Sequence, residues 1–235
     1  MPQAAFWDVD TQNDFMLPGG RLHVKGAEKL RPRLRKLYAF AKKARLPVVA
    51  TGDAHSETDE ELREWPAHCL KGTEGQKKLP ETLLVRNAAV PHSAPVAHRT
   101  VATPHGAECQ ALYGGPPFLP GSQVILEKCH LDAFTNPSAA ALVRSSGVDR
   151  WIVFGVATDY AVRLAVLGLL KLGQKVTVVS DAIQGVRPDT SEQAAIEMQA
   201  AGAEFLTTAA VLKSLGGATR RRRPRVPFRK SRRSR

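Results

Sequence analysis

Short apolar runs alternate with amphipathic segments along most of the chain. Buried strands are predicted at residues 4–9, 47–51, 123–128, 151–156, 175–180 and 203–207. Between the first two, Leu34, Leu37 and Ala41 recur at helical spacing and predict a helix over 31–44. Further helices are predicted at 138–146, from Thr158 to Gly173, and at 190–201. A repeated strand–helix order is typical of a three-layer α/β/α fold with a doubly wound, mostly parallel sheet.

The stretch 86–122 interrupts this alternation. It contains six prolines together with several glycines, alanines and histidines. We therefore expect a long loop or insertion, which in a compact domain often forms a lid or a binding loop. The predicted organisation is one folded domain over 1–219, which includes this insertion, followed by a disordered, arginine-rich tail over 220–235.

Composition narrows the class of protein. The chain has 235 residues, of which 43% are hydrophobic and 24% charged, as in an ordinary soluble domain. No apolar run approaches the roughly 18 residues of a transmembrane helix, and the start MPQAAFWDVD lacks the basic region of a secretory signal. Cys69, Cys109 and Cys129 are an odd number of cysteines, which argues against a disulfide framework. These features predict a cytoplasmic protein without a membrane partner.

Positive charge is concentrated in the tail. The net charge is +12, and ten of the 34 basic residues lie in 220–235, which holds no acidic residue. We favour a solvated extension, because a run of like charges with two prolines does not fold alone. The alternatives are an arm that binds nucleic acid, or a nuclear import signal in a eukaryotic cell.

Polar clusters follow several of the predicted strands. They are DVDTQNDF (8–15), ATGDAH (50–55), EKCHLDAF (127–134) and GVATDYAV (155–162), with WPAHC (65–69) in a loop. The carboxyl ends of parallel strands meet at one edge of a sheet, and sites form there. We therefore expect these clusters to lie close together.

Individual residues in these clusters allow two interpretations. Asp53, His55 and His68 offer one carboxylate and two imidazoles, a set that suits zinc, iron or manganese. Asp-x-His pairs are also common on surfaces without a metal, so the spacing alone leaves both possibilities open. Taken alone, Asp10 could simply cap the end of its strand, and Lys128 could extend its side chain to solvent at the sheet edge.

Together the clusters resemble a known family. With PGG (18–20) and WPAHCLKGTEGQ (65–76), they are similar to the isochorismatase-like cysteine hydrolases, nearest to the nicotinamidase (pyrazinamidase) branch, over about residues 4–207. The resemblance implies a Cys–Asp–Lys triad, in which Asp10 is the general acid and base and Lys128 stabilises the thiolate. It also implies a divalent metal, zinc first with iron or manganese as alternatives, held by Asp53, His55 and His68.

The resemblance further implies a substrate and a reaction. Phe15 and Trp65 would wall a nicotinamide ring whose nitrogen the metal binds. A cis peptide bond between Val156 and Ala157 would aim the backbone N–H groups of residues 157 and 161 at the oxyanion. The family reaction converts nicotinamide and water to nicotinate and ammonia in pyridine nucleotide salvage, and family members are often homo-oligomers.

The sequence departs from the family pattern at the nucleophile. Ala161 stands where the family has its reactive cysteine, and loss of the nucleophile from such a triad costs a factor of about 10⁶ in kcat. We do not expect Cys69, Cys109 or Cys129 to replace it, because Cys129 would face away from the site as the neighbour of Lys128 on a strand. Two interpretations stay open: a nicotinamidase-like hydrolase that is inactive or crippled, whether by engineering or by nature, and a pseudoenzyme that binds a ligand or a partner.

Two smaller departures concern the metal and the pocket. Ala54 replaces an aromatic residue that is usual between the aspartate and the histidine, which predicts a roomier pocket. The segment SETDEE (56–61) lacks a family histidine, and Asp59 lies near that position. Asp59 could be a further metal ligand, but we slightly favour an acidic surface turn.

Overall fold

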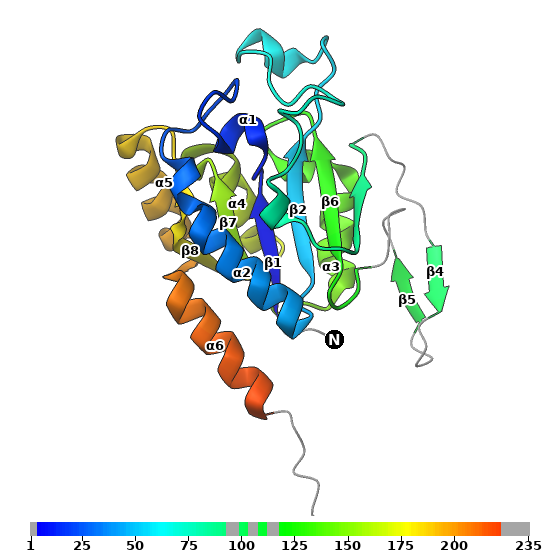
Figure 1. The fold of residues 1–235 in the computed structure, drawn as a ribbon. Coiled ribbons are helices and arrows are strands. Elements are labelled where there is room, and N and C mark those ends of the chain that lie inside the picture. The colour runs from blue at the N-terminus through cyan, green and yellow to red at the C-terminus, as the bar shows by residue number, and fades with distance from the viewer. Residues whose placement is uncertain (1–3, 93–98, 103–107, 112–117, 222–235) are drawn as a thin grey trace, which may run out of the picture.

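The computed structural model describes residues 4–92, 99–102, 108–111 and 118–221. At its centre lies a seven-stranded sheet in the order β3-β6-β2-β1-β7-β8-β9, in which every pairing is parallel. Figure 1 shows β1, β2 and β6 running upward side by side to one common edge. Their bounds are β1 Ala4–Val9, β2 Val48–Asp53, β3 Asn87–Val90, β6 Gln123–Lys128, β7 Arg150–Val156, β8 Lys175–Gln184 and β9 Glu204–Leu206. The predicted fold class is therefore confirmed.

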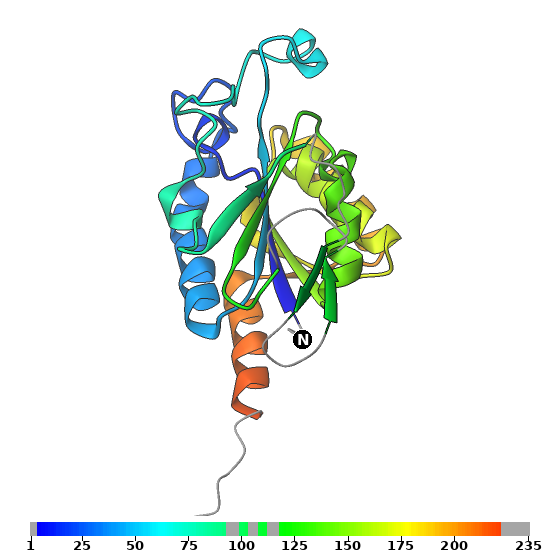
Figure 2. The same cartoon turned by 90° about the vertical axis from the view of Figure 1, so that its right-hand side faces the viewer.

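Helices cover both faces of the sheet. Helices α2 (Arg31–Ala44) and α6 (Thr208–Arg221) pack on one face, and α3 (Pro137–Ser146), α4 (Arg163–Lys171) and α5 (Pro188–Ala200) on the other. Figure 2 shows the three layers edge-on. The shorter helical segments are α1 Asn13–Met16, η1 Ala27–Leu30, η2 Glu60–Arg63, η3 Pro80–Thr82, η4 Ala133–Thr135 and the π-helical η5 Thr158–Val162. Among the described helices, none is both long and apolar enough to cross a membrane.

Strand β1 shows why the sheet needs both layers. Successive side chains of a strand point to opposite faces. Accordingly, Trp7 and Val9 are buried in the core beneath α3, α4 and α5, whereas Ala4 and Phe6 are buried in the core beneath α2. A strand covered on both faces reads as a continuous apolar run, which is the pattern seen in the sequence.

The interruption at 86–122 holds more structure than the sequence predicted. Residues Asn87–Val90 form β3, which pairs with β6 at the edge of the main sheet, and β4 (Arg99–Ala102) and β5 (Glu108–Ala111) form a separate antiparallel pair. We predicted a long loop or insertion here and did not predict these three strands. The NAAV sequence of β3 is largely unburied, so that it carries none of the apolar signal of a central strand.

The end of the folded chain also differs from the prediction. Helix α6 extends to Arg221, two residues beyond the boundary that we placed at 219. Its apolar side chains, among them the fully buried Val211, pack against the core beneath α2. Residues 222–235 of the predicted tail lie outside the described residues.

A matched pair of substitutions tests the assignment of the core. Val49 in the central strand β2 is fully buried, whereas Val85 is 96% exposed. We expect Val49→Ala to lower the free energy of unfolding by about 2 kcal/mol, through lost burial and the cavity left behind. Val85→Ala removes the same atoms and should change it by less than about 0.5 kcal/mol. Urea denaturation followed by circular dichroism measures both; equal effects would contradict the assignment.

Candidate active site

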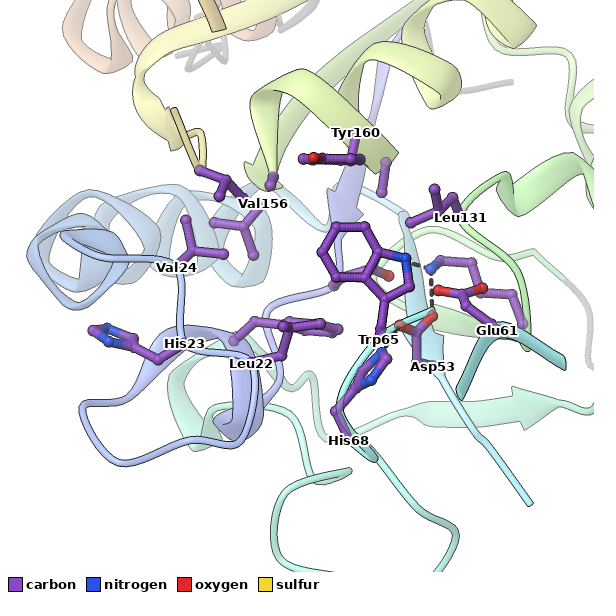
Figure 3. A pocket seen from close by; sticks show the side chains of 16 residues that line it. Leu22, His23, Val24, Asp53, Glu61, Trp65, His68, Leu131, Val156 and Tyr160 are labelled. Carbon is purple, nitrogen blue, oxygen red and sulfur yellow. Dashed lines mark hydrogen bonds and ion pairs between the residues drawn. The ribbon is translucent and has the colours of Figure 1, made fainter. Parts of the chain in front are cut away.

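The carboxyl ends of the central strands converge on one pocket. Strands β2 and β6 pair in a register that places Asp53 opposite Lys128, and Asp10 follows the neighbouring strand β1. Of the predicted site residues, all except His55 line this pocket. Its cavity volume is about 90 Å³, which suits a small molecule rather than a polymer. Figure 3 shows the lining side chains.

A buried lysine joins two carboxylates at the base of the pocket. The Lys128 Nζ atom lies 3.0 Å from Asp10 Oδ2 and also contacts Asp53 Oδ1. All three side chains are almost completely buried. Their charges sum to one negative charge, which a bound cation can balance.

The three groups shift one another's protonation. Burial alone would lower the pKa of Lys128, but the two carboxylates outweigh it and raise the pKa above its ordinary value. Burial raises the pKa of Asp53, but the Lys128 ammonium outweighs it and holds that pKa well below its usual range. Burial also raises the pKa of Asp10, and Lys128 only partly offsets this, so that the pKa lies above its ordinary value. Asp53 thus keeps its negative charge more readily than an ordinary aspartate, whereas Asp10 is better placed to carry a proton.

Backbone and hydroxyl contacts fix these carboxylates in place. Asp10 adopts the left-handed conformation, with φ of 47°, and accepts a hydrogen bond of 2.6 Å from the Thr51 hydroxyl. The Gln12 side chain accepts a 2.7 Å bond from the Asp53 N–H and donates a 2.8 Å bond to the Asp53 carbonyl oxygen. The roles of Thr51 and Gln12 were missed from sequence, because their partners follow a different strand.

Two imidazoles face the Asp53 carboxylate. His68 Nε2 lies 3.4 Å and His55 Nε2 3.7 Å from Asp53 Oδ2. The opposite nitrogens are held from behind: His68 Nδ1 by the Pro66 carbonyl oxygen at 2.8 Å, and His55 Nδ1 by Asp59 Oδ2 at 3.1 Å. Because both rear partners accept hydrogen bonds, each neutral ring carries its free lone pair on Nε2.

These residues fit a divalent cation. His55 Nε2 is buried and has no hydrogen-bond partner among the described residues, which is costly unless a ligand completes the site. Glu61 from η2 joins the group, and the four side chains of Asp53, His55, Glu61 and His68 each offer an atom within 4.8 Å of the others. Two imidazoles and two carboxylates suit zinc, iron or manganese.

The acidic segment 56–61 contributes in a way that the sequence did not predict. Asp59, which we expected to be a surface turn or a metal ligand, instead binds the rear nitrogen of His55 and so orients that ring. Glu61 was missed as a candidate, although burial and the charge of Asp53 raise its pKa. Neighbouring acidic residues in a loop carry no sequence signal that separates these roles.

Aromatic and aliphatic side chains form the walls of the pocket. The Phe15 ring lies edge-on to His68 with 5.3 Å between centroids, and Trp65 lies perpendicular to Tyr160 at 5.4 Å. Figure 3 shows Trp65 between Tyr160 and His68. Tyr160 was not predicted as a wall residue. Apolar walls with a charged end favour a flat ring that carries polar substituents.

The turn after β7 completes the pocket. The peptide bond between Val156 and Ala157 is cis, and η5 then leads into α4. The Asp159 carboxylate accepts hydrogen bonds from the backbone N–H groups of Val186, at 3.0 Å, and Arg187, at 3.2 Å, which ties this turn to the start of α5. Ala161 is 6% exposed and lines the pocket.

Among the described side chains, no cysteine reaches the position that Ala161 occupies. None of the described residues that line the pocket is a cysteine, serine or threonine. Cys69 is fully buried beside Gly75, and burial together with nearby carboxylates raises the pKa of its thiol, so that it stays protonated. The side chain of Cys109 lies outside the described residues.

The loop 65–76 is fastened to the loop after β1. The Asp14 carboxylate accepts hydrogen bonds from the backbone N–H groups of Cys69, at 2.7 Å, and Arg21, at 3.0 Å. A Cβ atom at Gly75 would lie 2.1 Å from Asp14 Oδ2, so that any larger residue there would displace this carboxylate. This contact places His68 and Trp65 over the pocket.

Comparison with known proteins agrees with this geometry. The chain belongs to the isochorismatase domain family, which it matches over residues 5–92 and 84–210. It is 29% identical over 230 residues to the nicotinamidase of Escherichia coli K12, covering 89% of this chain and 97% of that protein. It is 30% identical over 205 residues to the nicotinamidase/pyrazinamidase of Mycobacterium tuberculosis, covering 84% and 95%.

A solved structure of one relative is a complex with zinc. The pyrazinamidase of Pyrococcus horikoshii, crystallised in complex with zinc, superposes with a TM-score of 0.67 at 28% identity, covering 88% of this chain and 99% of that one.

Two isosteric substitutions test the role of Asp59. We expect Asp59→Asn to weaken zinc binding by about 10- to 100-fold, because the carboxylate that orients His55 is lost. Glu57→Gln removes the same charge from an exposed position in the same loop and should leave the affinity unchanged. Competition with a chromophoric chelator measures both affinities. Equal weakening in the two variants would show that only the general charge of the loop matters.

Proposed function

We propose that this pocket binds nicotinamide or a closely related heteroaromatic carboxamide, and that it has the architecture of a nicotinamidase without its nucleophile. The observation that carries the proposal is the arrangement of the Asp10–Lys128 pair beside the group formed by Asp53, His55 and His68. The pair and the group open into one apolar-walled cavity that Ala161 also lines. The relatives named above support the substrate class.

The proposed binding mode uses the two ends of the pocket. Phe15, Trp65 and Tyr160 enclose the ring. Zinc, held by Asp53, His55 and His68 with Glu61 beside them, would offer a ligand position to the ring nitrogen. The carboxamide then points toward Asp10 and Ala161. The backbone N–H groups of Ala157 and Ala161, in the turn that follows Val156, are our candidates for binding the amide oxygen.

Hydrolysis in such a pocket needs a nucleophile at position 161. With a cysteine there, the thiolate would attack the carboxamide carbon, while Asp10 gives a proton to the departing ammonia. Water, deprotonated by the same carboxylate, would then release the acid and restore the thiolate. Lys128 would hold Asp10 in place throughout.

Alanine at 161 removes the first of these steps. A methyl group forms no bond to the substrate, so that Asp10 and Lys128 would act only on whatever water reaches the carbon. By analogy with other triad enzymes, this loss costs a factor of about 10⁶ in kcat. We therefore propose that binding without efficient turnover is the property of this chain, which makes a ligand-binding or interaction role the second candidate function.

Restoring the sulfur tests this proposal. We expect Ala161→Cys to raise kcat/KM for nicotinamide by several orders of magnitude, up to about 10⁶-fold, because a thiol there faces both the substrate and Asp10. The unmodified chain should bind nicotinamide in the presence of zinc and release almost no ammonia. An ammonia-release assay measures turnover, and isothermal titration calorimetry measures binding.

A matched control places the same substitution outside the pocket. Ala165 is fully buried one turn further along, in α4, and is not among the pocket-lining residues. Ala165→Cys should therefore leave turnover as low as in the unmodified chain. Turnover by the unmodified chain at a rate near that of Ala161→Cys would refute the proposed role of position 161. If neither the unmodified chain nor Ala161→Cys binds nicotinamide, the proposed substrate class is refuted.

A further inference from the structure

A second group of metal-ligating side chains lies at the same edge of the sheet, outside the pocket. It consists of His92, which follows β3, and of Cys129 and His130, which follow β6. The two strands pair in parallel, with Val90 opposite Leu126, so that their carboxyl ends lie side by side. Each of the three residues offers one ligand atom within 4.8 Å of the other two.

One nitrogen in this group lacks a partner. His92 Nδ1 is buried and has no hydrogen-bond partner among the described residues. A buried polar atom left unpaired is unfavourable, and each such atom in a native structure calls for an explanation such as an ion. The His130 ring, 5.8 Å away between centroids and inclined by 68°, is one of the two other side chains in the group. A cation bound through His92 Nδ1 would supply the missing partner.

We propose that His92, Cys129 and His130 form a second metal site, and that its metal is zinc. A thiolate with two imidazoles is a donor set that favours zinc over magnesium, calcium or manganese. Zinc bonds of 2.0–2.3 Å require ligand atoms about 3.3–3.8 Å apart in a tetrahedron. Ligand atoms already within 4.8 Å reach that geometry by small side-chain rotations.

The proposed site is open on one side. His130 is exposed, whereas Cys129 and His92 are half-buried, so that a metal can enter from solvent. Three protein ligands leave the fourth tetrahedral position to water or to an exogenous ligand. Nearby carboxylates also favour a cation, because Asp59 and Glu61 both act electrostatically on Cys129, while Lys71 acts in the opposite direction.

This site differs from the one in the pocket by its ligands. The pocket group consists of carboxylates and imidazoles, whereas the second group alone contains a sulfur. None of His92, Cys129 and His130 lines the pocket. The proposal therefore does not depend on the substrate or on the residue at position 161.

Cobalt substitution distinguishes the two sites. A cobalt(II) ion bound by a thiolate gives a charge-transfer absorption in the near ultraviolet, which carboxylate and imidazole ligands do not give. We expect the full-length, untagged chain to bind two zinc ions, and its cobalt form to show this absorption. Cys129→Ser should remove the absorption and reduce zinc, measured by mass spectrometry after dialysis, from two ions per chain to one.

Control variants assign the signal to one sulfur. Cys69→Ser and Cys109→Ser should keep the absorption. His68→Gln should keep it while the pocket zinc is lost. Because His130 is exposed, His130→Asn should fold normally, and we expect it to weaken zinc binding at the second site at least tenfold.

Three results would overturn the proposal. They are a single zinc ion without thiolate absorption in the unmodified chain, an absorption that survives Cys129→Ser, and an absorption that depends on Cys69 or Cys109. Circular dichroism of each variant would show whether a lost signal reflects lost folding. If Cys129→Ser does not fold, the zinc affinity of His130→Asn tests the second site instead.

Discussion

The site depends on one buried ammonium group shared by two carboxylates. Lys128 contacts Asp10 and Asp53 at the ends of three neighbouring strands, and water reaches none of the three side chains freely. Removing Lys128 would leave two buried carboxylates without their counter-charge, which is strongly unfavourable. The register of β1, β2 and β6 is therefore constrained by electrostatics at their ends as well as by apolar packing along their length.

The two carboxylates that share this ammonium group differ in their pKa shifts. Both contact the same ammonium, yet the pKa of Asp53 falls and that of Asp10 rises. Asp53 remains an anion beside two imidazoles, where a cation is favoured. Asp10 lines the pocket together with Ala161, and its raised pKa lets it hold a proton more readily than an ordinary aspartate. Two chemically identical side chains thus acquire different roles from their surroundings.

The sequence predicted the central strands and helices better than the edge strand β3 and the long-range contacts of the site. The helix 31–44 and the strands at 4–9 and 123–128 were placed at their observed bounds, because their apolar periods are complete. Strand β3 was missed because small, exposed residues give no such period. Within the site, the charged and metal-ligating residues next to a predicted strand end could be identified from the sequence. The contributions of Gln12 and Glu61 depend on how distant loops fold back, which no local pattern encodes.

The two groups of potential ligands follow from the same topology. The carboxyl ends of parallel strands lie at the same edge of the sheet. Polar residues that follow neighbouring strands therefore come together at this edge. Lys128 marks the boundary between the groups: its own side chain enters the pocket, and the next two residues, Cys129 and His130, turn toward His92. One strand end thus serves an oxygen- and nitrogen-rich group on one side and a sulfur-containing group on the other. In the proposed function, the sulfur-free set in the pocket would hold a metal with a position open to a substrate nitrogen, whereas the proposed second site would hold its metal through a thiolate.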